Sequence, residues 1–143
     1  DRLASDFKIS GPMLDRIDIQ IEVGSLTYEV LRDNTPREPS AEIRKRVERA
    51  RERMTKRYAG TGIYANGQLT PAMIREYCVT DERADSLLKS AFERLGLSAR
   101  GYDRILRLAK TIADMDACDI IGEKHIAQAI QLRSLDRKYW QTV

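Results

Sequence analysis

The sequence has little cysteine, few aromatic residues and no long apolar run, and each shortage excludes a class of protein. Cys78 and Cys118 lack CxxC spacing, and the single histidine, His125, lies near neither of them in the sequence. A disulfide framework or a metal site therefore has no support, and we interpret both cysteines as reduced thiols of a cytoplasmic protein. No apolar stretch approaches the ~18 residues of a membrane span, so we expect no membrane partner.

The sequence also has only a small excess of positive over negative charge. The net charge is +3 in a chain of 143 residues, of which 33% are charged and 42% hydrophobic. Such a composition is typical of a soluble, mainly helical protein of one domain. So small an excess permits a nucleic-acid or phosphate partner only where the cations cluster.

Residues 17–23 alternate strictly between apolar and polar side chains, and the apolar ones are Ile17, Ile19, Ile21 and Val23. This pattern predicts a half-buried strand. A strand needs neighbours for its backbone groups, and nothing downstream alternates in this way. We therefore expect its sheet to be formed by sequence N-terminal to Asp1, with residues 1–24 as the edge of that domain.

Turn-forming residues such as Asn34, Pro36 and Pro39 mark residues 25–40 as a linker, and residues 41–143 read as a helical domain. The expected helix N-caps are Ser40, Thr70, Asp81 (or Thr80) and Ser98. Gly96 is expected to end a helix. The predicted helices span about 41–59, 71–77, 81–95, 99–115 and 123–132. Five helices with short connections predict a small all-α bundle, against which we expect the 135–140 tail to dock Trp140.

Residues 62–69, GIYANGQL, have the glycine spacing of a phosphate loop. Gln68 and Leu69 stand where that motif requires lysine and a hydroxyl residue. Without the ammonium group and the Mg²⁺ ligand, the stretch is interpreted as an ordinary loop. The chain by itself is therefore not expected to hydrolyse a nucleotide or to bind a cofactor.

Three blocks resemble one family in the same order along the chain. The blocks are SGPMLDRIDI, LGLSARGYDRILRLAKTIADMD and HIAQAIQLRSLDRKYW. They are similar to segments of the magnesium-chelatase and ComM/YifB branch of AAA+ ATPases, with Met13 and Gly101 as departures from the commoner pattern. The resemblance implies a fold that is all-α: a helical bundle of the AAA+ C-terminal lid type, with a short N-terminal helix/strand overhang from the AAA+ core.

The resemblance also implies site residues and partners. Arg16 would be an arginine finger acting in trans on the neighbouring subunit of a homo-oligomeric ring, a hexamer. Arg100 would be the sensor-2 arginine acting in cis, with Arg104 as the alternative one turn further along the helix. ATP and Mg²⁺ would be cofactors of the whole protein. Without the resemblance, Arg16 would be interpreted as a surface arginine paired with Asp15 or Asp18.

The predicted helix over 41–59 carries eight lysines and arginines against three glutamates. One interpretation is a solvated face with Glu42–Arg46 and Glu52–Lys56 pairs. The other is a contact with the DNA backbone, which would be salt-dependent and indifferent to sequence. Its candidate residues are Arg44, Lys45, Arg49, Arg53, Lys56 and Arg57.

These observations favour the lid of a ComM/YifB-type ATPase that couples ATP hydrolysis to remodelling of branched DNA. One alternative is a magnesium-chelatase motor subunit that drives metal insertion into a porphyrin. Another is a non-enzymatic helical module that binds DNA through the basic helix. The histidine, His125, is interpreted as structural.

Overall fold

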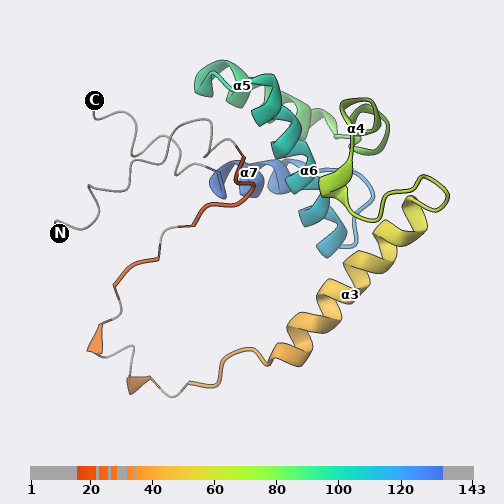
Figure 1. The fold of residues 1–143 in the computed structure, drawn as a ribbon. Helices are drawn as coiled ribbons and strands as arrows, with labels where there is room; N and C mark the ends of the chain where they lie inside the picture. Colours follow the sequence, from red (N-terminus) through yellow and green to blue (C-terminus); the bar gives the residue numbers. More distant parts are fainter. Residues whose placement is uncertain (1–15, 22, 26, 29–31, 34, 134–143) are drawn as a thin grey trace.

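A computed structural model describes residues 16–21, 23–25, 27–28, 32–33 and 35–133 of the chain, and Figure 1 shows their arrangement. Within these residues five α-helices and one 3₁₀ turn form and no strand does, so the predicted all-α class is confirmed. The elements are α3 (Ser40–Arg57), η1 (Asn66–Gln68), α4 (Pro71–Tyr77), α5 (Glu82–Leu95), α6 (Ala99–Met115) and α7 (Glu123–Gln131). None of the described helices is long and apolar enough to cross a membrane.

Helix α6 lies at the centre of the bundle. It packs against α7, α3, α4 and η1, while α5 covers α7. Its apolar stripe follows helical spacing, which places the stripe on one face. That face supplies much of the core, with Ile105, Leu106, Ala109 and Ala113 all 4% exposed or less.

Local signals set most helix boundaries. The side chains of Thr70, Asp81 and Ser98 each accept a hydrogen bond from a backbone N–H in the first turn of the following helix, at 3.3, 2.7 and 3.0 Å. Gly96 ends α5 with a positive φ of 52°, a conformation that glycine adopts without the steric cost of a Cβ. These four predictions are confirmed.

The predicted start of the first helix is wrong by one residue. Pro39 is the N-cap, in an extended conformation, and its carbonyl accepts from the N–H groups of Glu42 and Ile43 at 3.0 and 3.3 Å. Ser40 is therefore the first helical residue and does not cap. The helix also ends at Arg57, two residues early, because Tyr58 leaves helical geometry and is buried in the bundle.

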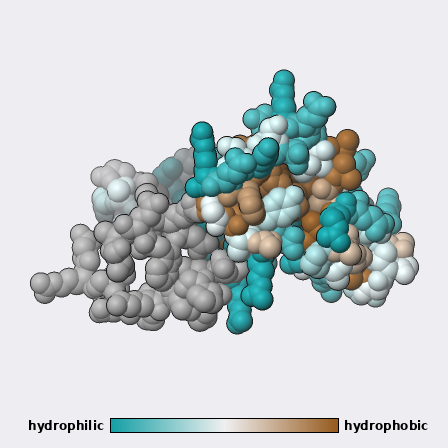
Figure 2. Space-filling model, turned by 90° about the horizontal axis from the view of Figure 1, so that it is seen from above, coloured by the Kyte–Doolittle hydropathy of each residue, from teal (hydrophilic) through white to brown (hydrophobic). Residues whose placement is uncertain are grey.

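Only the C-terminal half of α3 packs on the bundle. Ala50 and Met54 are buried, whereas every described residue from 40 to 49 is exposed, including Ile43 at 43% and Val47 at 40%. Figure 1 shows α3 extending away from the other helices toward the segment that precedes it. On the face seen in Figure 2, hydrophilic side chains project outward beside exposed apolar residues.

The predicted strand over 17–23 is wrong for the described residues 17–21 and 23, which are not in a strand. Ile17, Ile19, Ile21 and Val23 are 40–82% exposed, whereas Gln20 is 8% exposed. The apolar side chains of the alternation are therefore exposed, and the backbone of the segment contacts the residues after α7 instead, where the Gln20 N–H donates to the Leu132 carbonyl at 2.7 Å. The predicted docking of residues 135–140 falls outside the described residues.

Candidate functional site

Arg100 lies in the first turn of α6. Ser98 caps this helix, so Arg100 is the second helical residue and its side chain is exposed. Within the described part of the chain its guanidinium makes neither a hydrogen bond nor an ion pair. A free guanidinium at a helix N-terminus can bind an anion, because the helix dipole adds to its charge.

Arg104, one turn further along α6, is already engaged. Its guanidinium forms an ion pair with Asp18 and donates from Nη1 to the backbone carbonyl of Arg16 at 2.9 Å. The side chain of Arg104 is 22% exposed and that of Asp18 is 62% exposed. Of the two sensor candidates, Arg100 is therefore the one with an available guanidinium.

The Arg16 side chain is exposed and has no partner among the residues that the structure places. Asp18, one of the two partners considered from the sequence, pairs with Arg104 instead. Asp15, the other, lies outside the described residues. The structure therefore holds the main chain of Arg16 next to α6 while its guanidinium faces solvent.

Arg133 and Leu132 hold the same segment from the end of α7. Arg133, 7% exposed, donates from Nη1 to the carbonyls of Ile17 and Asp18 at 2.9 and 3.4 Å. The backbone N–H of Gln20 donates to the Leu132 carbonyl at 2.7 Å. No sequence pattern predicts these contacts, because arginines that bind distant backbone carbonyls have no characteristic spacing.

The six DNA candidates on α3 divide into two groups. Arg44, Lys45, Arg49 and Lys56 are exposed on its outer surface. Lys45 pairs with Glu42 at 2.8 Å, and Arg46 pairs with Glu38 rather than with the predicted Glu42. The remaining two candidates face the bundle: Arg53 pairs with Asp119 and Arg57 with Asp114. Four of the six candidates therefore lie on the exposed outer face of α3, and one of them, Lys45, is paired with Glu42.

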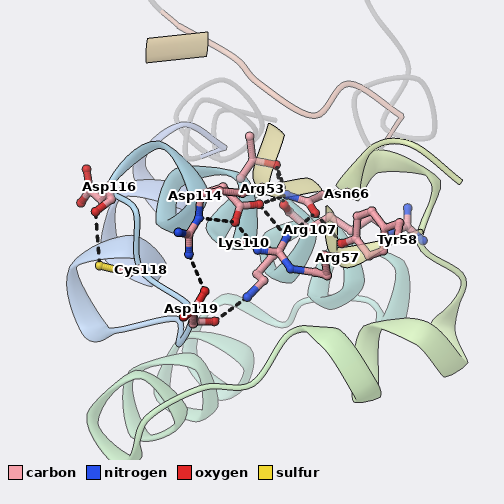
Figure 3. A network of polar contacts seen from close by, with 11 residues as sticks. Arg53, Arg57, Tyr58, Asn66, Arg107, Lys110, Asp114, Asp116, Cys118 and Asp119 are labelled. Atoms are coloured by element: carbon pink, nitrogen blue, oxygen red, sulfur yellow. Dashed lines mark hydrogen bonds and ion pairs between the residues drawn. The ribbon is translucent and has the colours of Figure 1, made fainter. Parts of the chain in front are cut away.

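Asp114 on α6 is the centre of a polar network inside the bundle, shown in Figure 3. Its carboxylate is fully buried and accepts two hydrogen bonds from Arg57, one of them at 2.8 Å, and one from Asn66 Nδ2 at 2.9 Å. Arg53 Nε lies 3.7 Å away. The bond to Asp114 is the main cause that raises the pKa of Arg57. These contacts fasten α3 and η1 to α6.

The network continues through neutral groups. Tyr58 donates to Asn66 Oδ1 at 2.5 Å, and Asn66 Nδ2 also donates to Thr111 Oγ1 at 3.1 Å. Burial raises the pKa of the Tyr58 hydroxyl, which therefore stays a donor at neutral pH. Asn66 was interpreted from the sequence only as part of a loop, since an Asn-Gly pair indicates a turn and says nothing of a buried partner.

His125 and Lys110 also make structural contacts. His125 is 2% exposed, and its Nδ1 accepts from the Gly122 N–H at 2.9 Å while Nε2 lies 3.2 Å from Asp116. Lys110, also 2% exposed, donates to the Asp119 carbonyl, and burial is the main cause that lowers its pKa. The described residues contain no group of three His, Cys, Asp or Glu that could hold a metal ion.

A small helical bundle centred on α6 is consistent with the all-α lid domain predicted from the sequence. Residues 37–133 match the family described as "Magnesium chelatase, subunit ChlI C-terminal", and the chain belongs to this family.

Similar proteins place the chain in the ComM/YifB-like part of the family. It is 37% identical over 135 residues to YifB of Escherichia coli and 35% identical over 131 residues to the competence protein ComM of Haemophilus influenzae. Both alignments cover 91% of this chain but 25% of the relative, so the chain spans about a quarter of each. The predicted resemblance to a ComM/YifB-like C-terminal domain is confirmed.

Proposed function

We propose that this chain is the lid of a ring-forming AAA+ ATPase of the ComM/YifB type, in which it couples ATP binding and hydrolysis to remodelling of branched DNA. One observation carries the proposal. Arg100 and Arg16 both lie near the N-terminal end of α6, each with an exposed side chain whose guanidinium has no partner among the described residues. Two such cations fit the stabilisation of phosphate charge, because a guanidinium is permanently charged and forked.

In this proposal Arg100 binds the phosphates of the nucleotide in cis and Arg16 reaches the γ-phosphate held by the neighbouring subunit of a hexamer. The phosphate loop and the Mg²⁺ ligands belong to sequence outside these 143 residues. ATP and Mg²⁺ are then cofactors of the whole cytoplasmic protein. The main chain of Arg16 lies against Arg104, one turn from Arg100, so the two arginines are close together in one subunit and subunit mixing distinguishes action in cis from action in trans.

Subunit mixing in the whole protein tests both assignments. Arg16→Ala should reduce hydrolysis by about 10³-fold or more while ATP binding persists, because the finger acts mainly in the transition state. Mixing these subunits with subunits disabled in the phosphate loop should restore part of the activity if Arg16 acts in trans. Arg100→Ala subunits should gain nothing from the same partner if Arg100 acts in cis. Normal turnover of Arg16→Ala would refute the proposal.

We further propose that the outer face of α3 contacts the DNA backbone through Arg44, Lys45, Arg49 and Lys56. Each lost phosphate contact lowers the slope of log affinity against log salt by about 0.9. Arg44→Ala with Arg49→Ala should therefore lower it by about 2. Arg75→Ala with Arg83→Ala, which removes the same charge from α4 and α5, is the matched control. Equal losses in the two double variants would exclude an α3 site.

The family description favours one rival function, that of a magnesium-chelatase motor subunit. A chelatase motor would hydrolyse ATP faster with a porphyrin and its metal-insertion partners than with branched DNA. A DNA-remodelling ring would show the reverse order. Measuring ATP turnover of the whole protein with each substrate therefore separates the two functions.

A further inference from the structure

We propose that Arg104 and Arg133 are positioning residues that clamp the segment bearing Arg16 to the α6–α7 pair, so that a movement of α6 is passed to Arg16. The proposal rests on the proposed function, since it assigns Arg16 and Arg100 their roles in ATP hydrolysis. The clamp would let a nucleotide bound at Arg100 change the position of Arg16.

The clamp holds the segment mainly by its backbone. Arg104 donates to the carbonyl of Arg16, and Arg133 donates to the carbonyls of Ile17 and Asp18. Arg104 also pairs with the Asp18 carboxylate. Because the contacts to Arg16 are made by its carbonyl, its own side chain remains exposed and available to a neighbouring subunit.

The apolar side chains of this segment are largely exposed. Ile17, Ile19 and Ile21 are 40%, 51% and 65% exposed. The buried residue is Gln20, whose N–H donates to the Leu132 carbonyl at 2.7 Å. The hydrogen bonds from Arg104 and Arg133 are therefore a main attachment of the segment to the bundle, and single substitutions can remove them.

The two clamping arginines stand on one rigid unit. Helices α6 and α7 pack together more extensively than any other pair of described helices, with Ile105, Ile126 and Ala129 fully buried at 1% exposure or less. Arg100 and Arg104 are one turn apart on α6, and Arg133 follows the end of α7. A displacement of Arg100 by bound phosphate would therefore carry both clamping residues with it.

Hydrogen exchange at the Gln20 amide tests the clamp in the chain itself. Neither Arg104→Ala nor Asp18→Asn removes the bond from Gln20 to Leu132, so faster exchange would report release of the whole segment. We expect Arg104→Ala to accelerate exchange about tenfold, with a smaller effect of Asp18→Asn. Arg83→Ala, an exposed arginine on α5, should change nothing. Unchanged exchange in Arg104→Ala, in a chain with wild-type circular dichroism, would overturn the clamp.

Kinetics of the whole protein test whether the clamp acts through Arg16. Arg104→Ala should lower kcat for ATP with little change in KM, and Arg104→Lys should recover it only in part because an ammonium lacks the fork. Arg16→Ala with Arg104→Ala should be no slower than Arg16→Ala alone. A raised KM at constant kcat, or losses that multiply in the double variant, would show instead that Arg104 acts on the nucleotide directly.

The two experiments separate the clamp from the proposed function. If Arg16→Ala retains normal turnover, the function assigned to Arg16 is wrong and so is its coupling to α6. Exchange at Gln20 would still decide whether Arg104 holds the segment. If Arg16→Ala is inactive but Arg104→Ala has normal kcat, the proposed function stands and the clamp has no role in catalysis.

Discussion

Replacing Arg57 by alanine should destabilise the bundle far more than replacing Arg46, although both arginines belong to α3 and both form ion pairs. Arg57 is 15% exposed and its partner Asp114 is fully buried. Arg46 and its partner Glu38 are 48% and 44% exposed. The two substitutions therefore remove the same side chain from one helix in two different environments.

The magnitudes follow from these exposures. Removing one partner of a buried pair costs ~3–5 kcal/mol, because a carboxylate remains buried without its counter-ion. Asp114 keeps the bond from Asn66 and the approach of Arg53, so we expect about 3 kcal/mol for Arg57→Ala. An exposed pair contributes ~0.2–1 kcal/mol, which is the expected cost of Arg46→Ala.

Urea unfolding followed by far-ultraviolet circular dichroism measures both free energies. For a bundle of this size, the loss for Arg57→Ala corresponds to a fall in Tm of about 12 °C or more. Arg57→Lys should recover less than half of the loss, since an ammonium cannot make two parallel bonds to the carboxylate. If the two alanine variants differ by less than about 0.5 kcal/mol, the buried pair does not hold α3 on the bundle.

Three further predictions concern glycine and cysteine. Gly96→Ala should lower the free energy of unfolding by about 1 kcal/mol, because φ is 52° there and a Cβ is unfavourable in that conformation. Gly101→Ala should raise the free energy of unfolding by about 0.5–1 kcal/mol, because alanine favours the helix and its Cβ would lie 3.5 Å from the nearest side-chain atom. Both changes are measured by thermal unfolding. Equal effects would contradict the assigned backbone geometry. A thiol reagent at pH 8 should label the partly exposed Cys118 first and the buried Cys78 only on unfolding; early labelling of Cys78 would contradict its burial. Burial raises the pKa of Cys78 to about 11, so its contribution to stability is present below the pKa of the unfolded thiol, near 9, and is lost as pH rises to 11. Urea titrations at several pH values should show a weaker decline above pH 9 in Cys78→Ala, and an unchanged decline would assign it to other groups.

Helix starts could be predicted from the sequence where the signal is local. Thr70, Asp81 and Ser98 each cap their helix with a side chain three residues from its donor. Ser40 carried the same signal and did not cap, because Pro39 already occupied the N-cap with an extended backbone. The sequence alone therefore does not distinguish a serine at the N-cap from a serine that is the first helical residue.

The polar network and the clamp could not be predicted, because their partners are far apart in the chain. Asp114 and Arg57 are 57 residues apart, and Arg104 and Asp18 are 86 residues apart. Periodicity identified α6 and α3 as amphipathic helices and left open which polar residues would face each other. The alternation over 17–23 predicted a half-buried strand, but its apolar residues are exposed and the described residues of this range form no strand, because a strand also needs neighbours that alternation cannot identify.

The one-sided packing of α3 has a consequence for the order in which the helix forms. Isolated helices shorter than about 12–15 residues are marginal in water, since starting a helix costs more than extending it. The exposed half of α3, from Ser40 to Arg49, has no buried residue to offset that cost. Helix formation should therefore nucleate at Met54 and Arg57, where the bundle and Asp114 fix the backbone, and propagate toward Ser40. Fraying should run in the opposite direction, so that the end of α3 carrying Arg44 and Lys45 is the first to unwind and a bound polyanion there would extend the helix.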